Sequence, residues 1–256
     1  MLPSHDDRAV NRRGIRLAHI DMRRARQRAY DRPNSSLSTA ALNADFVPWL
    51  SFTASILLLI AYEWRVHYIG QRQPERLARY AKAKLRMHWV VSLADKPGME
   101  IVAVQALRNS LMAASISAST AALAVMGALS MSGASLAANL SRWSGENALH
   151  TVLQGMLVGI LFASYVCSAL STRHYSHASF IMSIPVDRPE RDDLNPAAAN
   201  HVRRAGLMYS WGLRLFLMVL PVVAGVVHPL VMFPATLLLI GGLVLFDQPT
   251  HDVEVD

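Results

Sequence analysis

The chain has 256 residues, of which 52% are hydrophobic and only 17% are charged, whereas soluble domains carry about 25% charged residues. Its formal net charge is nevertheless +7 and its pI is about 10.0. The shortage of charge and a mean hydropathy of +0.25 indicate a membrane protein and exclude intrinsic disorder for most of the chain. The single cysteine, Cys167, excludes an internal disulfide and a zinc site built on cysteines.

The first 45 residues differ from the rest, because they contain nine arginines and no lysine. The first apolar run begins too late for a secretory signal. No nucleic-acid-binding module is recognisable, so we do not expect nucleic acid as a partner. Residues 1–45 are predicted to form a mobile basic arm close to anionic lipid head groups. A start at Met22 is an alternative that the sequence leaves open.

Four charge-free runs follow, and they predict an all-α, polytopic transmembrane helical bundle of about five spans. A span needs roughly 20 apolar residues, and these runs are apolar all round rather than on one face. His228 precedes Pro229 and therefore disfavours helix, which divides the last run in two. A re-entrant final pair or an interfacial first helix would reduce the number to four. The predicted spans are residues 46–64, 104–130, 149–169, 206–226 and 230–246.

The first connection alternates basic and apolar residues at helical spacing, as at Leu77, Tyr80, Ala81 and Leu85. This pattern predicts a basic amphipathic interfacial helix over about 71–95 within a membrane domain at 46–247. Residues 183–200 contain three prolines and are expected to form a loop. Residues 248–256 form an acidic tail.

The distribution of basic residues predicts which side of the membrane each connection faces. The connections after the first and third predicted spans are the most basic, and the positive-inside rule places both in the cytoplasm. With five spans the basic arm would then lie outside, which is unfavourable. Four spans would remove this conflict, so the side of the arm stays open.

Two intramembrane polar features are candidates for function. Gln105, Arg108 and Asn109 lie at i, i+3 and i+4, hence on one helix face near a membrane boundary. They are interpreted either as the lining of a pathway or pocket or as a hydrogen-bonded staple between helices. Arg214 lies roughly two turns inside the fourth span. We expect it to reach the interface or to pair with an acid, the candidates being Glu63, Glu100 and Asp247.

The histidine pair His174 and His177, at i and i+3, is a candidate binding site at a membrane boundary. Such a pair can share a metal or lie beside a haem. No carboxylate at ligand spacing accompanies it, so no metal site and no cofactor are predicted. Interfacial hydrogen bonding is the default interpretation.

The remaining motifs concern helix packing. Gly155 and Gly159 form a G-x-x-x-G pattern that lets helices approach closely, either within the chain or between copies. No phosphate loop, nucleophile elbow or dinucleotide fingerprint is present, so the sequence favours a protein that is not an enzyme.

Several residues recur in a characteristic order over residues 87–90, 103–114, 177–180 with Pro185, 204–206 with Tyr209, 212–214, Pro221, Pro229, Met232 and Phe233. This order resembles the bacterial membrane-protein family catalogued as domain of unknown function 599. The resemblance covers about residues 47–247, whereas the arm before residue 46 departs from the pattern. It implies a multi-span inner-membrane protein and implies no activity.

Three function classes follow from these observations. The favoured class is a structural or accessory membrane component, such as an oligomer or a subunit of a larger complex. The second is a channel or small transporter that uses the Gln105, Arg108, Asn109 cluster together with Arg214. The third, a haem-binding or redox membrane protein, depends on the histidines alone.

Overall fold

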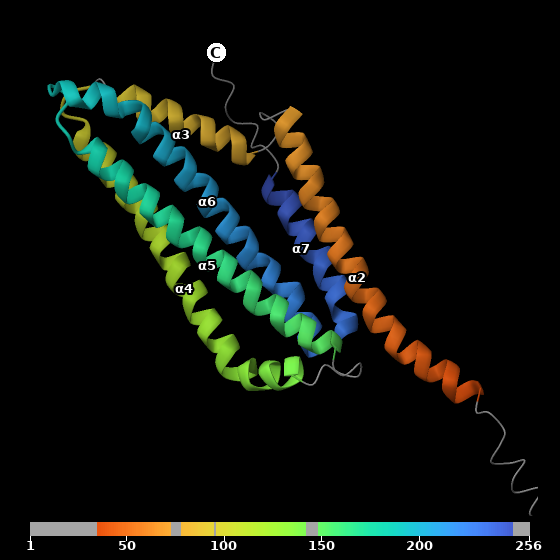
Figure 1. Cartoon of the computed structure of the whole chain (residues 1–256). Helices are drawn as coiled ribbons and strands as arrows, with labels where there is room; N and C mark the ends of the chain where they lie inside the picture. The colour runs from red at the N-terminus through yellow and green to blue at the C-terminus, as the bar shows by residue number, and fades with distance from the viewer. Residues whose placement is uncertain (1–34, 73–77, 95, 142–147, 248–256) are drawn as a thin grey trace, which may run out of the picture. The chain divides into compact units, whose positions relative to one another are not determined.

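The computed structural model describes residues 35–72, 78–94, 96–141 and 148–247. Contacts divide the chain into two units, Met1–Phe46 and Val47–Asp256. The larger unit holds the helical bundle (Figure 1). Residues 1–34 of the predicted arm and the predicted acidic tail lie outside the described residues, so both stay predictions.

All the regular secondary structure in the described part of the chain is helical, which confirms the predicted all-α class. The helices are long, and they are joined by short connections. They are α2 (Ser35–Arg72), α3 (Ala78–Ala94), α4 (Glu100–Ser141), α5 (Ala148–Met182), α6 (Pro189–Val227), the 3₁₀ turn η3 (Pro229–Val231) and α7 (Met232–Asp247).

Four segments are long and apolar enough to cross a membrane, namely Phe46–Arg72, Glu100–Ser141, Ala148–Met182 and Pro189–Val227. The chain is therefore a multi-pass membrane protein. The predicted fifth span corresponds to α7, whose 16 residues extend only about 24 Å against a hydrocarbon core of about 30 Å. The predicted turn at His228 is confirmed, because α6 ends at Val227 and His228 has extended backbone angles.

The helices extend beyond the predicted spans, and one prediction is wrong. Residues 183–200 were expected to form a loop, but α6 begins at Pro189. Proline is tolerated at the first helical position because its missing N–H would have no partner there. Glu190 and Asp192 in the first turn favour the positive end of the helix dipole. The predicted surface helix is also shorter at its start, since α2 continues to Arg72 and α3 begins at Ala78.

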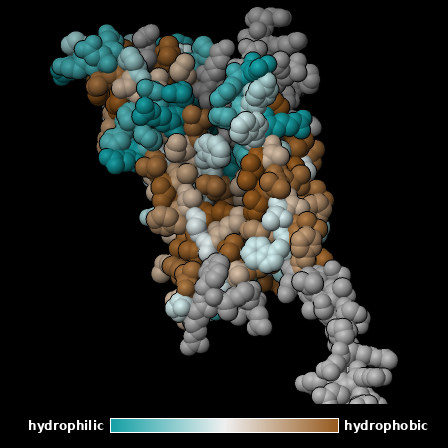
Figure 2. Space-filling view, turned by 45° about the vertical axis from the view of Figure 1, so that its right-hand side comes forward, coloured by the Kyte–Doolittle hydropathy of each residue, from teal (hydrophilic) through white to brown (hydrophobic). Residues whose placement is uncertain are grey.

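Charged side chains gather at one end of the bundle, here called the polar end. It consists of α3, the first turns of α4, the last turns of α5 and the first turns of α6. Figure 2 shows hydrophilic surface over this end and a hydrophobic band below it. This division agrees with the sequence, because residues 109–141, 148–172 and 215–246 carry no Asp, Glu, Lys or Arg.

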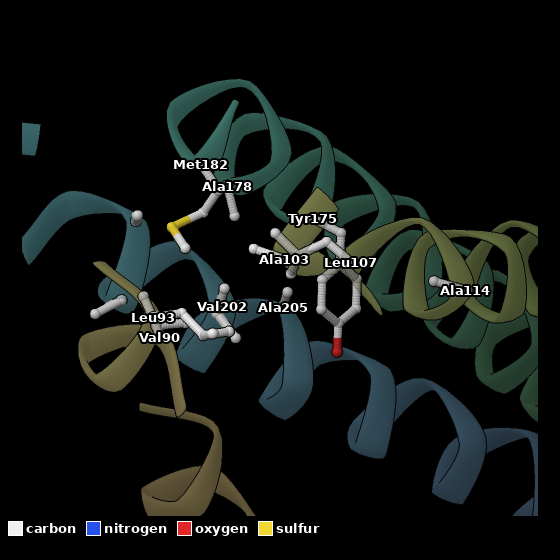
Figure 3. Packing of buried hydrophobic residues seen from close by; sticks show 12 residues of the cluster. Val90, Leu93, Ala103, Leu107, Ala114, Tyr175, Ala178, Met182, Val202 and Ala205 are labelled. Atoms are coloured by element: carbon white, nitrogen blue, oxygen red, sulfur yellow. The ribbon is translucent and has the colours of Figure 1, made fainter. Parts of the chain in front are cut away.

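The polar end has a buried core of its own (Figure 3). Val90 and Leu93 of α3 pack there with residues of the other three helices, and Tyr175 of α5 is only 3% exposed. Helix α3 thus buries one face on the bundle, while Leu85 and Val91 remain exposed. Contact of α3 with lipid stays a prediction. The other core members include Ala103, Leu107, Ala178, Met182, Val202 and Ala205.

Helix α2 packs against α6 and α7 through a second buried cluster. Leu59, Tyr62 and Val66 of α2 contact Leu239 and Leu243 of α7 in this cluster. At the opposite end of the bundle the Ser51 hydroxyl donates to the Pro229 carbonyl at 2.9 Å. These contacts hold α2 beside the α6–α7 pair and position Glu63 of α2 toward α6.

Candidate functional site

The centre of the bundle contains a buried ion pair between α2 and α6. Arg214 Nη1 lies 2.9 Å from Glu63 Oε1, and the two side chains are 6% and 20% exposed. A charge inside the bilayer is costly unless it is paired. The pair therefore neutralises the one arginine that lies deep in α6 and ties that helix to α2.

The choice of partner resolves an alternative left open by the sequence. Of the three acids considered for Arg214, Glu63 pairs with it, and the side chain of Asp247 lies outside the described residues. Glu100 at the start of α4 instead accepts a hydrogen bond from the backbone N–H of Val186 at 3.3 Å. This second bond joins α4 to the turn between α5 and α6, at the polar end.

A third polar feature, centred on Arg191, was missed by the sequence analysis. Arg191 is fully buried, and its guanidinium donates to the carbonyl oxygens of Ile181, Met182 and Ile184 at the end of α5. Its Nε also donates to Asn195 Oδ1 at 2.9 Å. The last carbonyls of a helix have no partners within the helix, so Arg191 caps α5 from α6. Its signal in the sequence was hidden because residue 191 lay in the predicted loop.

The predicted cluster on α4 does not line a site inside the chain. Gln105, Arg108 and Asn109 are all exposed, although they do share one face as expected. Arg108 is therefore on the outside of the bundle, whereas Arg214 is buried against Glu63. The structure places the two arginines in different environments.

The two predicted histidines are joined by a third from α6. His174 Nδ1 lies 3.0 Å from His201 Nδ1, and the ring of His177 lies 5.4 Å from the ring of His201. Within the described part of the chain, no group of three His, Cys, Asp or Glu residues has an arrangement that could hold a metal ion. His201 could not be paired with His174 from the sequence, because the two residues lie on different helices and are 27 positions apart.

Close packing between α5 and α6 depends on hydroxyl and glycine contacts. Ser164 Oγ donates to the Gly212 carbonyl at 2.7 Å, and Ser171 Oγ donates to the Ala205 carbonyl at 2.8 Å. The predicted G-x-x-x-G motif plays no such part within the chain, because a Cβ on Gly155 or Gly159 would meet nothing within 4 Å. Its other predicted role, packing between copies, stays untested.

Replacing Gly212 with Ala is expected to weaken the α5–α6 contact. The added Cβ would lie 2.7 Å from Ser168 Oγ and 3.3 Å from the Ser164 backbone oxygen, and such overpacking costs about 1–3 kcal/mol. Thermal unfolding in detergent measures this loss. Gly159→Ala is the matched control and should be neutral or stabilising, since Ala is the better helix former. Equal effects of the two substitutions would contradict the assignment.

The bundle surface also carries an apolar groove between α6 and α7. Its volume is about 350 Å³, and leucines such as Leu217, Leu220 and Leu239 line it. Leu220 and Leu238 at this groove are 61% and 80% exposed. The groove offers apolar contact only, which suits the hydrocarbon of a bilayer.

The arrangement as a whole uses its buried polar groups to join helices. Each of the contacts described above links two elements: α2 with α6, α4 with the α5–α6 turn, and α5 with α6. A search of the curated proteins and a search of the solved structures found no match. The model of the family described as "Protein of unknown function, DUF599" matches residues 50–251, and the chain belongs to this family.

Proposed function

We propose that the protein is a structural membrane component that works as a homo-oligomer joined through the exposed face of α4. The observation that carries the proposal is the exposure of Gln105, Arg108 and Asn109 on a membrane-spanning helix. Polar side chains on such helices promote association, because they can hydrogen-bond across to a neighbouring helix.

Helix α4 lies at the periphery of the bundle. Only 11% of the most apolar stretch of α4 is buried inside the chain, whereas 33% of the corresponding stretch of α6 is buried. Met112, Ile116 and Leu123 continue the exposed face beyond the polar cluster, and each is more than half exposed. A face that is mixed polar and apolar in this way has the composition of a helix–helix contact.

The two amides of the cluster are self-complementary, which favours a second copy as the occupant. In a two-fold dimer with parallel α4 helices, each residue meets its own equivalent at the same depth. The amides of Gln105 and Asn109 each carry donors and an acceptor, so they can pair reciprocally. Arg108 carries only donors and would use the amide oxygens of the neighbouring copy.

Three hydroxyls on the neighbouring turns of α4 do not compete for this role, because they are satisfied within their own helix. Ser110, Ser117 and Thr120 donate to carbonyls four residues earlier, at 3.3, 3.1 and 2.9 Å. In the described part of the chain, no hydrogen bond engages the side chains of Gln105, Arg108 and Asn109. These three side chains are therefore available to a neighbouring copy.

The same proposal includes a location, the bacterial inner membrane, with the polar end in the cytoplasm. The support for this orientation is the gathering of Arg86, Arg173, Arg203 and Arg204 near that end, as the positive-inside rule requires. The connections after α2 and after α5 would then both be cytoplasmic. Reporter fusions to the two connections test it.

The double variant Gln105→Ala/Asn109→Ala is expected to dissociate into monomers under conditions in which the wild type is a dimer. Interhelical hydrogen bonds in membranes contribute about 1–2 kcal/mol in model peptides, so losing two should weaken association about tenfold or more. Light scattering of the full chain in mild detergent measures the protomer number across a dilution series.

Thr53→Ala is the matched control for this experiment. Thr53 is also an exposed polar residue of a membrane-spanning helix, but its hydroxyl donates to Trp49 and Leu50 of its own helix. We expect the control to remain dimeric. A wild-type chain that is monomeric at every concentration would refute the proposal, as would a double variant that associates as tightly as the wild type.

A further inference from the structure

The polar end carries a cluster of basic side chains on α5 and α6 that the proposed function does not use. His174 and His177 lie at i and i+3 on α5, and His201 and Arg204 lie at i and i+3 on α6. Residues with this spacing share a helix face. The two helices pack together, so the two pairs form one patch.

The three imidazoles are in direct contact. The rings of His174 and His201 are 5.3 Å apart, those of His177 and His201 are 5.4 Å apart, and the two Nδ1 atoms of the first pair approach to 3.0 Å. His177 is exposed and the other two are half-buried. A ligand could therefore reach the cluster from the surface.

The described charged groups that act on His174 and His201 are all basic. Arg204 and Arg173 act on His174, and Arg204 with His177 acts on His201. The nearest carboxylates earlier on α6, Asp192 and Asp193, lie more than two helical turns from His201, which is at least about 12 Å along the axis. Within the described ranges, no carboxylate is among the charged groups that act on His174 and His201.

The contact between the two Nδ1 atoms has room for one proton. In the 3.0 Å contact one ring must donate from Nδ1 while the other accepts. When both rings are protonated, both Nδ1 atoms carry hydrogens that face each other, and the contact is lost. An anionic oxygen placed between the two N–H groups would accept a hydrogen bond from each and so bridge the two protonated rings.

We propose that His174, His177, His201 and Arg204 form a proton-dependent site for the phosphate group of an anionic lipid. A phosphate oxygen has the charge and the acceptors that paired imidazolium and guanidinium donors recognise. The patch belongs to the polar end, where a multi-pass protein meets lipid head groups. This inference depends on the membrane placement and is independent of the proposed dimer.

The test measures how strongly the full chain selects an anionic lipid in phosphatidylcholine vesicles. Spin-labelled phosphatidylglycerol is compared with spin-labelled phosphatidylcholine, and electron paramagnetic resonance gives the protein-bound share of each. The charge of phosphatidylglycerol is constant between about pH 5.5 and about pH 8, whereas histidine changes its charge over this range. We expect the preference for phosphatidylglycerol to be several-fold greater at the acidic end.

Two kinds of variant distinguish the contribution of histidine protonation from that of the permanent arginine charge. His201→Gln and His174→Gln should each remove most of the pH dependence, and Arg204→Gln should lower the preference at both pH values. Arg203→Gln is the matched control, because Arg203 is an equally exposed neighbour that donates instead to Asn200 Oδ1 at 3.2 Å. We expect the control to change little. Arg204 lies at the surface, so its variant tests the site even if a histidine variant does not fold.

A competition arm identifies the source of the phosphate. If soluble glycerol phosphate displaces the labelled lipid, the site binds the phosphate group wherever it is attached. If it does not, the lipid is the ligand. Equal binding of the two lipids by the wild type would overturn the proposal, as would a pH dependence that survives in both histidine variants.

Discussion

Replacing Glu63 with Gln is expected to lower the free energy of unfolding by about 3–5 kcal/mol, the usual cost of removing one partner of a buried ion pair. The substitution removes the carboxylate that lies 2.9 Å from Arg214 and leaves the buried positive charge of α6 without its counter-charge. Because this pair also connects α2 to α6, α2 should separate from the bundle first. Unfolding in mixed detergent micelles, followed by circular dichroism, measures the loss.

A double-mutant cycle separates the pair from its surroundings. Arg214→Met alone should also be destabilising, whereas Glu63→Gln combined with Arg214→Met should cost much less than the sum of the two, because no buried charge remains. Glu190→Gln, an exposed carboxylate on α6, is the control and should have little effect. Strict additivity in the cycle would show that the two side chains do not stabilise each other.

Replacing Arg191 with Met should have an effect of similar size at the other end of the bundle. The substitution leaves the carbonyls of Ile181, Met182 and Ile184 without the donor that caps them. The Ile181 carbonyl still accepts from the backbone N–H of Ile184, so two carbonyls lose their partner. Each such buried group costs about 1–3 kcal/mol, so a total loss of about 2–6 kcal/mol is expected in the same unfolding measurement. The turn between α5 and α6 should also become susceptible to protease.

Two further variants make this expectation specific. Arg191→Lys keeps the charge but cannot reproduce the fork of donors, so it should lie between the wild type and Arg191→Met. Arg188→Met is the matched control, because Arg188 is exposed and makes no side-chain cap at the start of α6. If Arg188→Met lowered the stability as much as Arg191→Met, the loss would come from removing a positive charge near this turn and not from losing the cap.

Much of the fold could be predicted from the sequence, because absence of charge over a membrane-length run has few other causes. The extension of α4, α5 and α6 beyond the bilayer could not be predicted in this way. Hydropathy marks only the part of a helix that lies in hydrocarbon, whereas the outer turns are held by the core around Tyr175 and Val202. Those residues are spread over four segments that the sequence does not bring together.

The candidate site could likewise be predicted only in part. The sequence predicted Arg214 to be an intramembrane charge and included Glu63 among its candidate partners. Both predictions need only the position of each residue along its own helix, which the sequence provides. It could not choose Glu63 over Glu100, and it missed Arg191 entirely, because burial of a polar residue depends on which helix packs over it. The exposure of Arg108 on the outside of the bundle was undetermined for the same reason.

Cross-linking of the full chain in native membranes tests the central claim, that α4 meets a second copy, most directly. Cysteine is introduced at Met112 of α4 or at Phe162 of α5 in a Cys167→Ser background. These side chains are 55% and 56% exposed, so they are matched in accessibility. The proposal predicts an oxidised dimer for Met112→Cys and little for Phe162→Cys, since a disulfide needs Cβ atoms about 4 Å apart. Equal cross-linking at the two positions, or none at either, would contradict it.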